Sequence, residues 1–201
     1  MLSNNEIKML TSLQKKKYRT EWGSFLIEGH KLIKDAILAE FPLKKIIFCS
    51  EFKDENLELL ITEAENYGIE VAEATEKQLK KISYVKTPQP VLAIGKVSSF
   101  PDQAQNLIKS WNKVLILDRI QDPGNLGTLM RTADWFGVDG VLLSEGCSDI
   151  YNPKVVRGSM GAIFRIPTIA DADLNKLTPA LKNNKIRVLA ADTSGDPITS
   201  L

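Results

Sequence analysis

Two short apolar runs on either side of a helical segment constrain the fold more than any other feature. The first run, KVLILD, covers residues 113–118, and the second, GVLLSEG, covers residues 140–146. A nearly continuous apolar run is typical of a parallel strand that is covered on both faces. Between the runs, Leu126 to Phe136 places apolar residues at helical spacing. The pattern therefore predicts a strand–helix–strand unit with a ligand site at the carboxyl ends of its strands.

Other segments extend this pattern in both directions. We expect further strands over residues 24–29, 44–50, 68–74, 90–97, 163–169 and 185–192. We expect further helices over residues 10–18, 30–39, 55–66 (with Leu59 facing inward) and 75–79. Between residues 95 and 112, Ser, Pro, Gln and Asn replace the regular patterning, which indicates a domain boundary. The sequence predicts an α/β protein with a small domain over 1–97, a linker over 98–112 and a mostly parallel domain over 113–201.

Composition excludes several classes of protein. No apolar stretch is long enough to cross a bilayer, and the first residues lack the apolar core of a secretory signal. Two distant cysteines, Cys49 and Cys147, favour free thiols in a reducing compartment, and a single histidine makes a zinc site improbable. We therefore expect a cytoplasmic protein with no membrane contact and no metal. The net charge of +1 leaves room only for a local attraction to nucleic acid.

The stretch DRIQDPGNLGTLMRTADWFG, residues 118–137, follows the first apolar run. Its glycines lack the Gly-x-Gly-x-x-Gly spacing, and no Lys-Ser or Lys-Thr follows, so a nucleotide-binding oxidoreductase and a phosphate loop are both disfavoured. Asp122-Pro123-Gly124-Asn125 instead predicts a tight turn in which Asn125 caps the next helix. Leu126, Leu129, Ala133 and Phe136 would share the buried face. Arg131 would point away from it, either as a solvated arginine or as a site residue.

Two segments carry a specific resemblance. LDRIQDPGNLGTLMRTADWFGVDGVLL and YNPKVVRGSMGAIFRIP resemble the first motif region of the SpoU (TrmH) RNA methyltransferases, which belong to the SPOUT class. Members of that class have a knotted α/β fold and transfer a methyl group from S-adenosylmethionine to a ribose 2′-hydroxyl of ribosomal or transfer RNA. KYRTEWGSFLIEGHKLIKDAI and TPQPVLAIGKV resemble the family's N-terminal substrate-binding domain, a small α/β fold shared with ribosomal RNA-binding proteins.

The resemblance implies roles for individual residues. Arg131 would be catalytic, because a fixed guanidinium stabilises the developing alkoxide and holds the adjacent phosphate. Asn125 would position substrate, although a helix cap explains it equally. Arg157 and Ser159 would contact the substrate in a cleft that Gly161 also lines. Ala191, Asp192 and Thr193 would contact the methyl donor. Turn or solvated-loop residues remain the alternative for these.

A basic cluster in the first half suggests where RNA binds. Lys15, Lys16, Lys17 and Arg19 lie close together, while acidic residues gather between Glu51 and Glu76. This separation leaves a basic side for RNA phosphates, although a charge run is also what a solvated face contains.

The resemblance also implies two motifs that these 201 residues do not contain: a Gly-Asn-Glu type loop and a Ser-Leu-Asn type helix. In the family they complete the trefoil knot, bind most of the cofactor and form much of the dimer interface. We therefore expect a SPOUT domain truncated before its knot, from a homodimeric parent protein. This chain alone should be inactive, dimerise weakly and bind S-adenosylmethionine poorly. The activity expected of the parent is 2′-O-methylation of structured RNA, with ribosomal RNA favoured over transfer RNA. A non-catalytic RNA-binding or ribosome-assembly factor on the same fold is the alternative.

Overall fold

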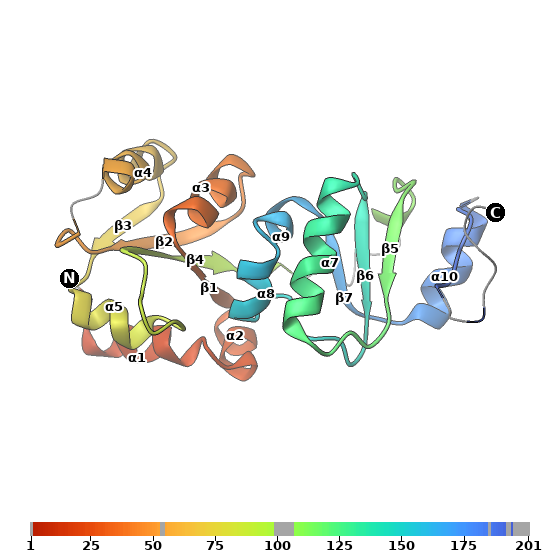
Figure 1. Cartoon of the computed structure of the whole chain (residues 1–201), viewed down its shortest axis with the longest axis horizontal. Coiled ribbons are helices and arrows are strands. Elements are labelled where there is room, and N and C mark those ends of the chain that lie inside the picture. Colours follow the sequence, from red (N-terminus) through yellow and green to blue (C-terminus); the bar gives the residue numbers. More distant parts are fainter. Residues whose placement is uncertain (1, 53–54, 99–106, 185, 192–193, 195–201) are drawn as a thin grey trace.

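The chain forms two units, each built on its own β-sheet, that lie side by side along the long axis of the molecule (Figure 1). The structure is a computed structural model, and it describes residues 2–52, 55–98, 107–184, 186–191 and 194. No helix among these residues is long and apolar enough to span a membrane.

The N-terminal unit has a four-stranded sheet in the order β1-β4-β2-β3. Strand β4 is antiparallel to both of its neighbours, and β2 is parallel to β3. The strands are β1 (Ser24–Glu28), β2 (Leu43–Phe48), β3 (Glu70–Glu73) and β4 (Val91–Lys96). The helices are α1 (Asn4–Ser12), α2 (Lys16–Trp22), α3 (His30–Leu38), α4 (Glu55–Asn66) and α5 (Glu76–Ile82).

Helices cover both faces of this sheet because successive strand residues point to opposite sides. Phe25, Ile27 and Ile46 belong to a buried cluster with residues of α3 and α4, whereas Leu26 and Ile47 belong to another with residues of α1 and α5. The alternation thus sorts apolar side chains into two layers.

The segment expected as one helix over residues 10–18 contributes to two helices, so that prediction is wrong. A capping box starts α1 early: the Ser3 hydroxyl accepts from the Glu6 N–H, and the Glu6 carboxylate accepts from the Ser3 N–H. A second helix then runs from Lys16 to Trp22 and is terminated by Gly23, whose φ of 53° is left-handed. Apolar periodicity alone placed the first helix too late, because the capping signal precedes it.

The C-terminal unit has a parallel sheet in the order β5-β6-β7. Its strands are β5 (Val114–Leu117), β6 (Gly140–Ser144) and β7 (Thr168–Ala172). Its helices are α7 (Pro123–Trp135), α8 (Pro153–Gly158), α9 (Ala162–Arg165) and α10 (Leu174–Asn183). The predicted α/β class and the parallel sheet of the second unit are confirmed. The exact domain limits, 1–97, 98–112 and 113–201, stay a prediction.

Two expected strands of this unit differ from the structure. Most of the segment 163–169 lies in helix α9 and the turn after it, because Gly161, with a φ of 86°, opens a short helix there. Only its last residues enter β7. The segment expected over 185–192 has no regular structure at 186–191, and its two end residues lie outside the described part.

The first apolar run forms β5 at an edge of the described sheet, and both of its faces are covered by apolar side chains, as predicted. Leu115 and Leu117 pack in the cluster shared with α7, and Val114 and Ile116 pack in the cluster shared with α10. Among the described residues, β5 pairs only with β6, and three of its four residues are half-buried. An apolar run is compatible with an edge position or a central position in the sheet, so the sequence did not distinguish the two.

Helix α7 begins earlier than predicted, and of the four residues predicted for its buried face Leu126, Leu129 and Ala133 lie on it whereas Phe136, just after the helix, does not. Asp122 is the N-cap, and its carboxylate accepts from the Asn125 N–H at 2.7 Å, so Asn125 is not the cap. Leu126, Met130 and Ala133 are buried, whereas Phe136 is 66% exposed. A similar error concerns α4, where the predicted inward residue Leu59 is 69% exposed.

Gly140 is required where β6 begins beside Trp111. A Cβ at Gly140 would lie 2.3 Å from the Trp111 ring, which is itself buried. We expect Gly140→Ala to lower the free energy of unfolding by about 1–3 kcal/mol through overpacking, as measured by urea denaturation. Adding Trp111→Leu should recover part of this loss, because the two positions share one space. Additive effects of the two substitutions would contradict this account.

The two units share one hydrophobic cluster. The rings of Phe25 and Tyr151 have centroids 4.4 Å apart, and those of Phe41 and Phe164 are 5.1 Å apart. The Tyr151 hydroxyl also accepts from the Ser98 N–H and donates to the Ser98 carbonyl, both at 3.0 Å. Apolar packing and hydrogen bonds therefore hold the units together.

Candidate functional site

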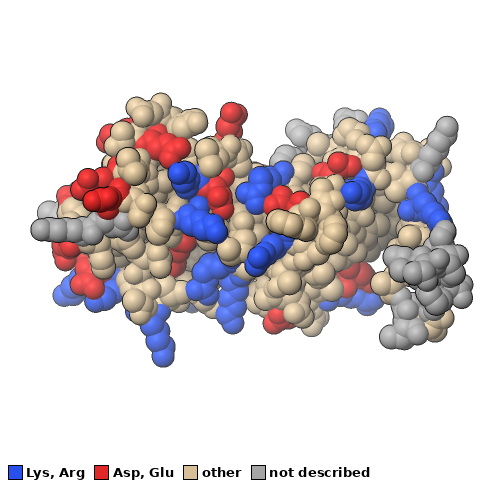
Figure 2. Space-filling model, turned by 45° about the horizontal axis from the view of Figure 1, so that its top comes forward, with Lys and Arg blue, Asp and Glu red and all other residues tan. Residues whose placement is uncertain are grey.

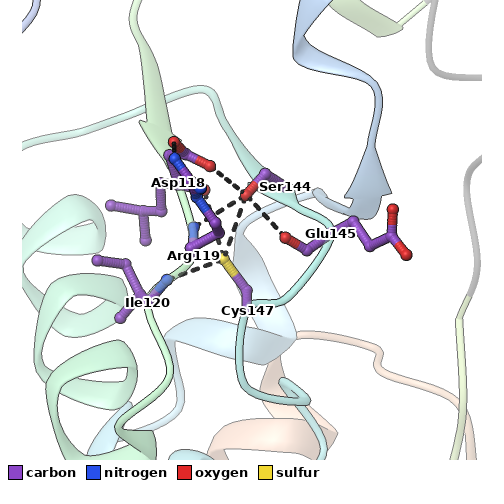
Figure 3. A network of polar contacts seen from close by, with 7 residues as sticks. Asp118, Arg119, Ile120, Ser144, Glu145 and Cys147 are labelled. Atoms are coloured by element: carbon purple, nitrogen blue, oxygen red, sulfur yellow. Dashed lines mark hydrogen bonds and ion pairs between the residues drawn. The ribbon is translucent and has the colours of Figure 1, made fainter.

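A network of polar contacts ties the loop after β5 to the loop after β6 (Figure 3). The Ser144 hydroxyl donates to the Asp118 carboxylate at 2.7 Å and accepts from the Arg119 N–H at 2.9 Å. The Cys147 thiol donates to the Leu117 carbonyl at 3.4 Å and accepts from the Ile120 N–H at 3.3 Å. In Figure 3 both side chains point toward the 118–120 segment, whereas the Glu145 carboxylate points away. The network thus fixes the loop that leads into α7.

The network has electrostatic consequences for Asp118. The Ser144 hydroxyl, followed by the Arg119 guanidinium at 3.1 Å, lowers the pKa of Asp118 below its usual value. Arg119 has a φ of 53°, which is uncommon for a residue with a side chain. A constrained, charged turn therefore lies at the carboxyl end of β5, where parallel sheets place ligands.

Helices α7 and α8 touch through their backbones at two glycines. A Cβ on Gly127 would lie 3.0 Å from both Cα and the carbonyl carbon of Gly158. Arg131 follows Gly127 by about one helical turn, and Arg157 directly precedes Gly158. The close approach thus joins the two helices that carry the predicted arginines.

The two arginines and Asn125 are exposed, as binding to RNA requires. The Arg157 guanidinium lies 5.6 Å from the centre of the Tyr84 ring. It lines a cavity of about 430 Å³ between the units, together with His30 and Lys31 at the start of α3.

Ser159 does not share this exposure. It is fully buried, and its hydroxyl donates to the Val156 carbonyl at 2.9 Å. Its side chain caps the end of α8, so the predicted substrate contact does not fit the structure. A turn, the alternative that the sequence left open, accounts for it.

The basic cluster of the N-terminal unit divides into two parts. Lys15, Lys16 and Lys17 are exposed at the start of α2. Arg19 is only 4% exposed, and its Nη2 and Nε bond Asp149 Oδ2 at 2.5 and 2.9 Å. Its prediction as a phosphate ligand is wrong, because the guanidinium already pairs with a carboxylate of the other unit.

The surface charges are unevenly distributed. Figure 2 shows Lys and Arg side chains gathered near the middle of one face, where the two units meet. Asp and Glu side chains gather toward the outer end of the N-terminal unit in the same view. The arrangement places positive charge beside the helices that carry the predicted site.

The residues predicted to bind the methyl donor fall at the limit of the described part. Ala191 is exposed in a segment without regular structure. Asp192 and Thr193 lie outside the described residues. Their role stays a prediction.

The sequence reasoning missed Asp118, Ser144, Cys147 and Asp149. Each follows or ends an apolar strand run, which is a weak signal for a sheet-edge site. Ser144 and Cys147 also line a second cavity of about 320 Å³ between the units, with Lys16 and Thr20 of α2 on its rim.

Comparisons with known proteins agree with this geometry. Residues 4–93 match the MRM3-like substrate binding domain, and residues 112–201 match the SpoU rRNA Methylase family. The 23S rRNA (guanosine(2553)-2′-O)-methyltransferase RlmP of Bacillus subtilis is 35% identical over 83% of this chain, which spans 62% of that protein. A putative TrmH family tRNA/rRNA methyltransferase of Staphylococcus aureus is 30% identical over 84% of this chain and 70% of its own length.

A solved structure shows the same arrangement. The crystal structure of an AdoMet-bound rRNA methyltransferase from Sinorhizobium meliloti matches 90% of this chain and 67% of its own, with a TM-score of 0.76 and 30% identity. The domain matches, the sequence identity and the shared fold lead to one conclusion. The chain belongs to the SpoU (TrmH) family of RNA methyltransferases.

Proposed function

We propose that the protein methylates a ribose 2′-hydroxyl in structured RNA, using S-adenosylmethionine, with ribosomal RNA as the favoured substrate. The observation that carries the proposal is that Arg131 is exposed on α7, and that α7 packs closely against α8 through the backbone contact between Gly127 and Gly158. The Bacillus subtilis relative is named as a 2′-O-methyltransferase of 23S rRNA, which supports both the reaction and the class of RNA. The expected cytoplasmic location fits such a substrate and stays a prediction.

Arg131 would act on the attacking oxygen. A 2′-hydroxyl is a weak nucleophile at neutral pH, so it must be oriented and stabilised while its proton passes to solvent, its oxygen bonds the methyl carbon and the carbon–sulfur bond of the donor breaks. A guanidinium presents its N–H donors along the edges of its plane, so one edge of Arg131 can bond the developing alkoxide while another bonds the neighbouring phosphate. Arg157, beside Tyr84, would hold a further part of the RNA at the boundary of the two units.

The methyl donor has an incomplete set of contacts among the described residues. S-adenosylmethionine, when bound, supplies an electrophilic methyl group. Ala191, the one predicted donor residue within the described part, is exposed and lines neither of the two cavities described above. One such residue does not make a donor site, so the steps proposed here concern only this chain's own side chains.

A homodimer is part of the proposal. Trp135 and Phe136, at the end of α7, are 86% and 66% exposed. Two neighbouring aromatic side chains on a surface are typical of an interaction site. Analytical ultracentrifugation of the complete gene product should show a dimer, and a monomer at micromolar concentration would contradict this.

Transfer of a labelled methyl group to RNA by the complete gene product tests the proposed reaction. We expect label in ribosomal RNA, at a position that resists alkaline cleavage because its 2′-oxygen is methylated. Label in transfer RNA alone would correct the substrate. RNA binding without any transfer would instead favour a non-catalytic assembly factor.

We propose that Lys15, Lys16 and Lys17 bind RNA phosphates. Replacing the three with Ala should weaken RNA binding and reduce the slope of log K against log salt by up to about 0.7–0.9 for each lost phosphate contact. Arg19 stays intact, so the relation between the units is kept. Replacing Lys77, Lys80 and Lys81 of α5 removes the same charge elsewhere and should change the slope less. Equal slopes for the two triple variants would remove the α2 cluster from the proposal.

A further inference from the structure

The ion pair between Arg19 and Asp149 connects the two units in a buried position. The side chains of Arg19 and Asp149 are 5% and 15% exposed. Arg19 lies on α2, two residues after the last of the three exposed lysines, and Asp149 lies in the loop between β6 and α8. A charge pair withdrawn from water forms only where geometry and further hydrogen bonds offset desolvation.

Further hydrogen bonds are present on both sides of the pair. Arg19 Nη1 donates to the Leu13 carbonyl at 2.8 Å, so the guanidinium also fixes the turn between α1 and α2. Asp149 Oδ1 accepts from the Tyr151 N–H at 3.0 Å, and Tyr151 in turn packs against Phe25. The pair is therefore held from both units.

The loop that contains Asp149 is connected to the site. The Ser148 N–H donates to the Ile120 carbonyl at 2.8 Å, and Cys147 bonds the backbone on either side of Asp118. The 118–120 segment leads into α7 and Arg131, and the loop itself leads into α8 and Arg157. Asp149 thus joins the lysine-bearing helix to both arginine-bearing helices through one short loop.

We propose that the Arg19–Asp149 ion pair fixes the position of α2 relative to the methyltransferase site, and that both are positioning residues for RNA. The inference rests on the proposed function. RNA phosphates bound by Lys15 to Lys17 are then at a set distance from Arg131, so the pair aligns the target ribose without touching it. An apolar contact would hold the units together as well, but a two-bond guanidinium contact also fixes their orientation.

We call the Arg19–Asp149 ion pair, in its role of holding the two units in one relative position, the clamp. The accessibility of two cysteines tests the clamp without reference to activity. Cys147 lies beside Asp149 and lines the cavity between the units, whereas Cys49 is fully buried in the N-terminal unit. In Arg19→Ala and Asp149→Asn, alkylation of Cys147 should be faster by about tenfold or more, because removal of one member of a buried pair opens the contact. Alkylation of Cys49, followed by peptide mass spectrometry, should stay at the wild-type rate.

Two results would overturn the clamp. If both cysteines react faster together, the pair only stabilises the whole fold. If neither changes, the pair does not hold the units. Lys45→Gln is the matched control, because Lys45 pairs with Glu6 and Glu70 within the N-terminal unit alone. It should leave Cys147 at the wild-type rate.

Methylation kinetics test the positioning role separately. In the complete gene product, with RNA and donor saturating, Arg19→Ala and Asp149→Asn should lower the single-turnover rate, on the order of 10²-fold if the ribose shifts by about 1 Å, while donor affinity stays unchanged. Arg19→Lys keeps the charge and loses the two-bond geometry, so it should recover only part of the rate. A wild-type rate in a variant whose Cys147 is exposed would overturn the positioning role. If wild-type protein transfers no methyl group, the proposed function fails, and the cysteine experiment still decides the clamp.

Discussion

Arg131→Ala in the complete gene product is expected to lower methyl transfer by about 10²–10³-fold, the scale seen when one charge-stabilising donor is lost. The side chain is exposed on α7, so the free energy of unfolding should change by less than about 0.5 kcal/mol. The measurement is single-turnover transfer with RNA and donor both saturating, which separates the chemical step from binding.

Two further variants sharpen this result. Arg131→Lys should restore little activity, because an ammonium group cannot reproduce the paired donors of a guanidinium. Lys182→Ala, which removes an exposed charge from the last turn of α10, should transfer at the wild-type rate. A near wild-type rate for Arg131→Ala would mean that this residue is only a solvated arginine on a surface helix.

Gly127→Ala is expected to damage the site from a distance. Its Cβ would lie 3.0 Å from backbone atoms of Gly158, which cannot rotate away as a side chain can, so α7 and α8 must separate. The overpacking cost of about 1–3 kcal/mol exceeds the gain of about 1 kcal/mol from replacing a helical glycine. The separation also displaces Arg131 from Arg157, and we expect the single-turnover rate to fall, by up to about 10²-fold if the displacement reaches about 1 Å.

Gly124→Ala is the matched control, in the same helix. There a Cβ meets only a carboxylate oxygen of Asp122 at 3.1 Å, and that side chain can move. The same oxygen caps α7, so the loss of about 1 kcal/mol from a disturbed cap roughly offsets the gain of about 1 kcal/mol from replacing a helical glycine. This variant should therefore keep a stability near that of wild type, and its rate should fall far less. If Gly127→Ala and Gly124→Ala behave alike in urea denaturation and in transfer, the contact between the helices does not position Arg131.

Features that depend on local patterning were predicted well. The strands on either side of α7 are short apolar runs with polar residues after them, and their identity follows from those few residues. The turn Asp122-Pro123-Gly124 likewise predicts the start of a helix, although the observed cap, Asp122, lies three residues before the predicted cap, Asn125. The arrangement of the first motif was therefore readable from the sequence.

Features that depend on distant partners were not predicted. Arg19 looks like a member of a lysine run, and its burial follows only from Asp149, 130 residues away. Ser159 looks like a ligand in a polar turn, and its burial follows from the way α8 ends. The short helix at 162–165 is set by the left-handed Gly161, which apolar patterning does not register.

The hydrophobic cluster that runs from Phe25 through Tyr151 to Phe164 has a consequence for folding. Two units with separate cores would melt in separate steps, whereas units that bury side chains in one another lose those contacts together. Either unit in isolation would expose aromatic rings that the other now covers, and such surfaces favour aggregation. We therefore expect the N-terminal and C-terminal units to unfold as one cooperative body, so that a core defect in either one lowers the melting temperature of both.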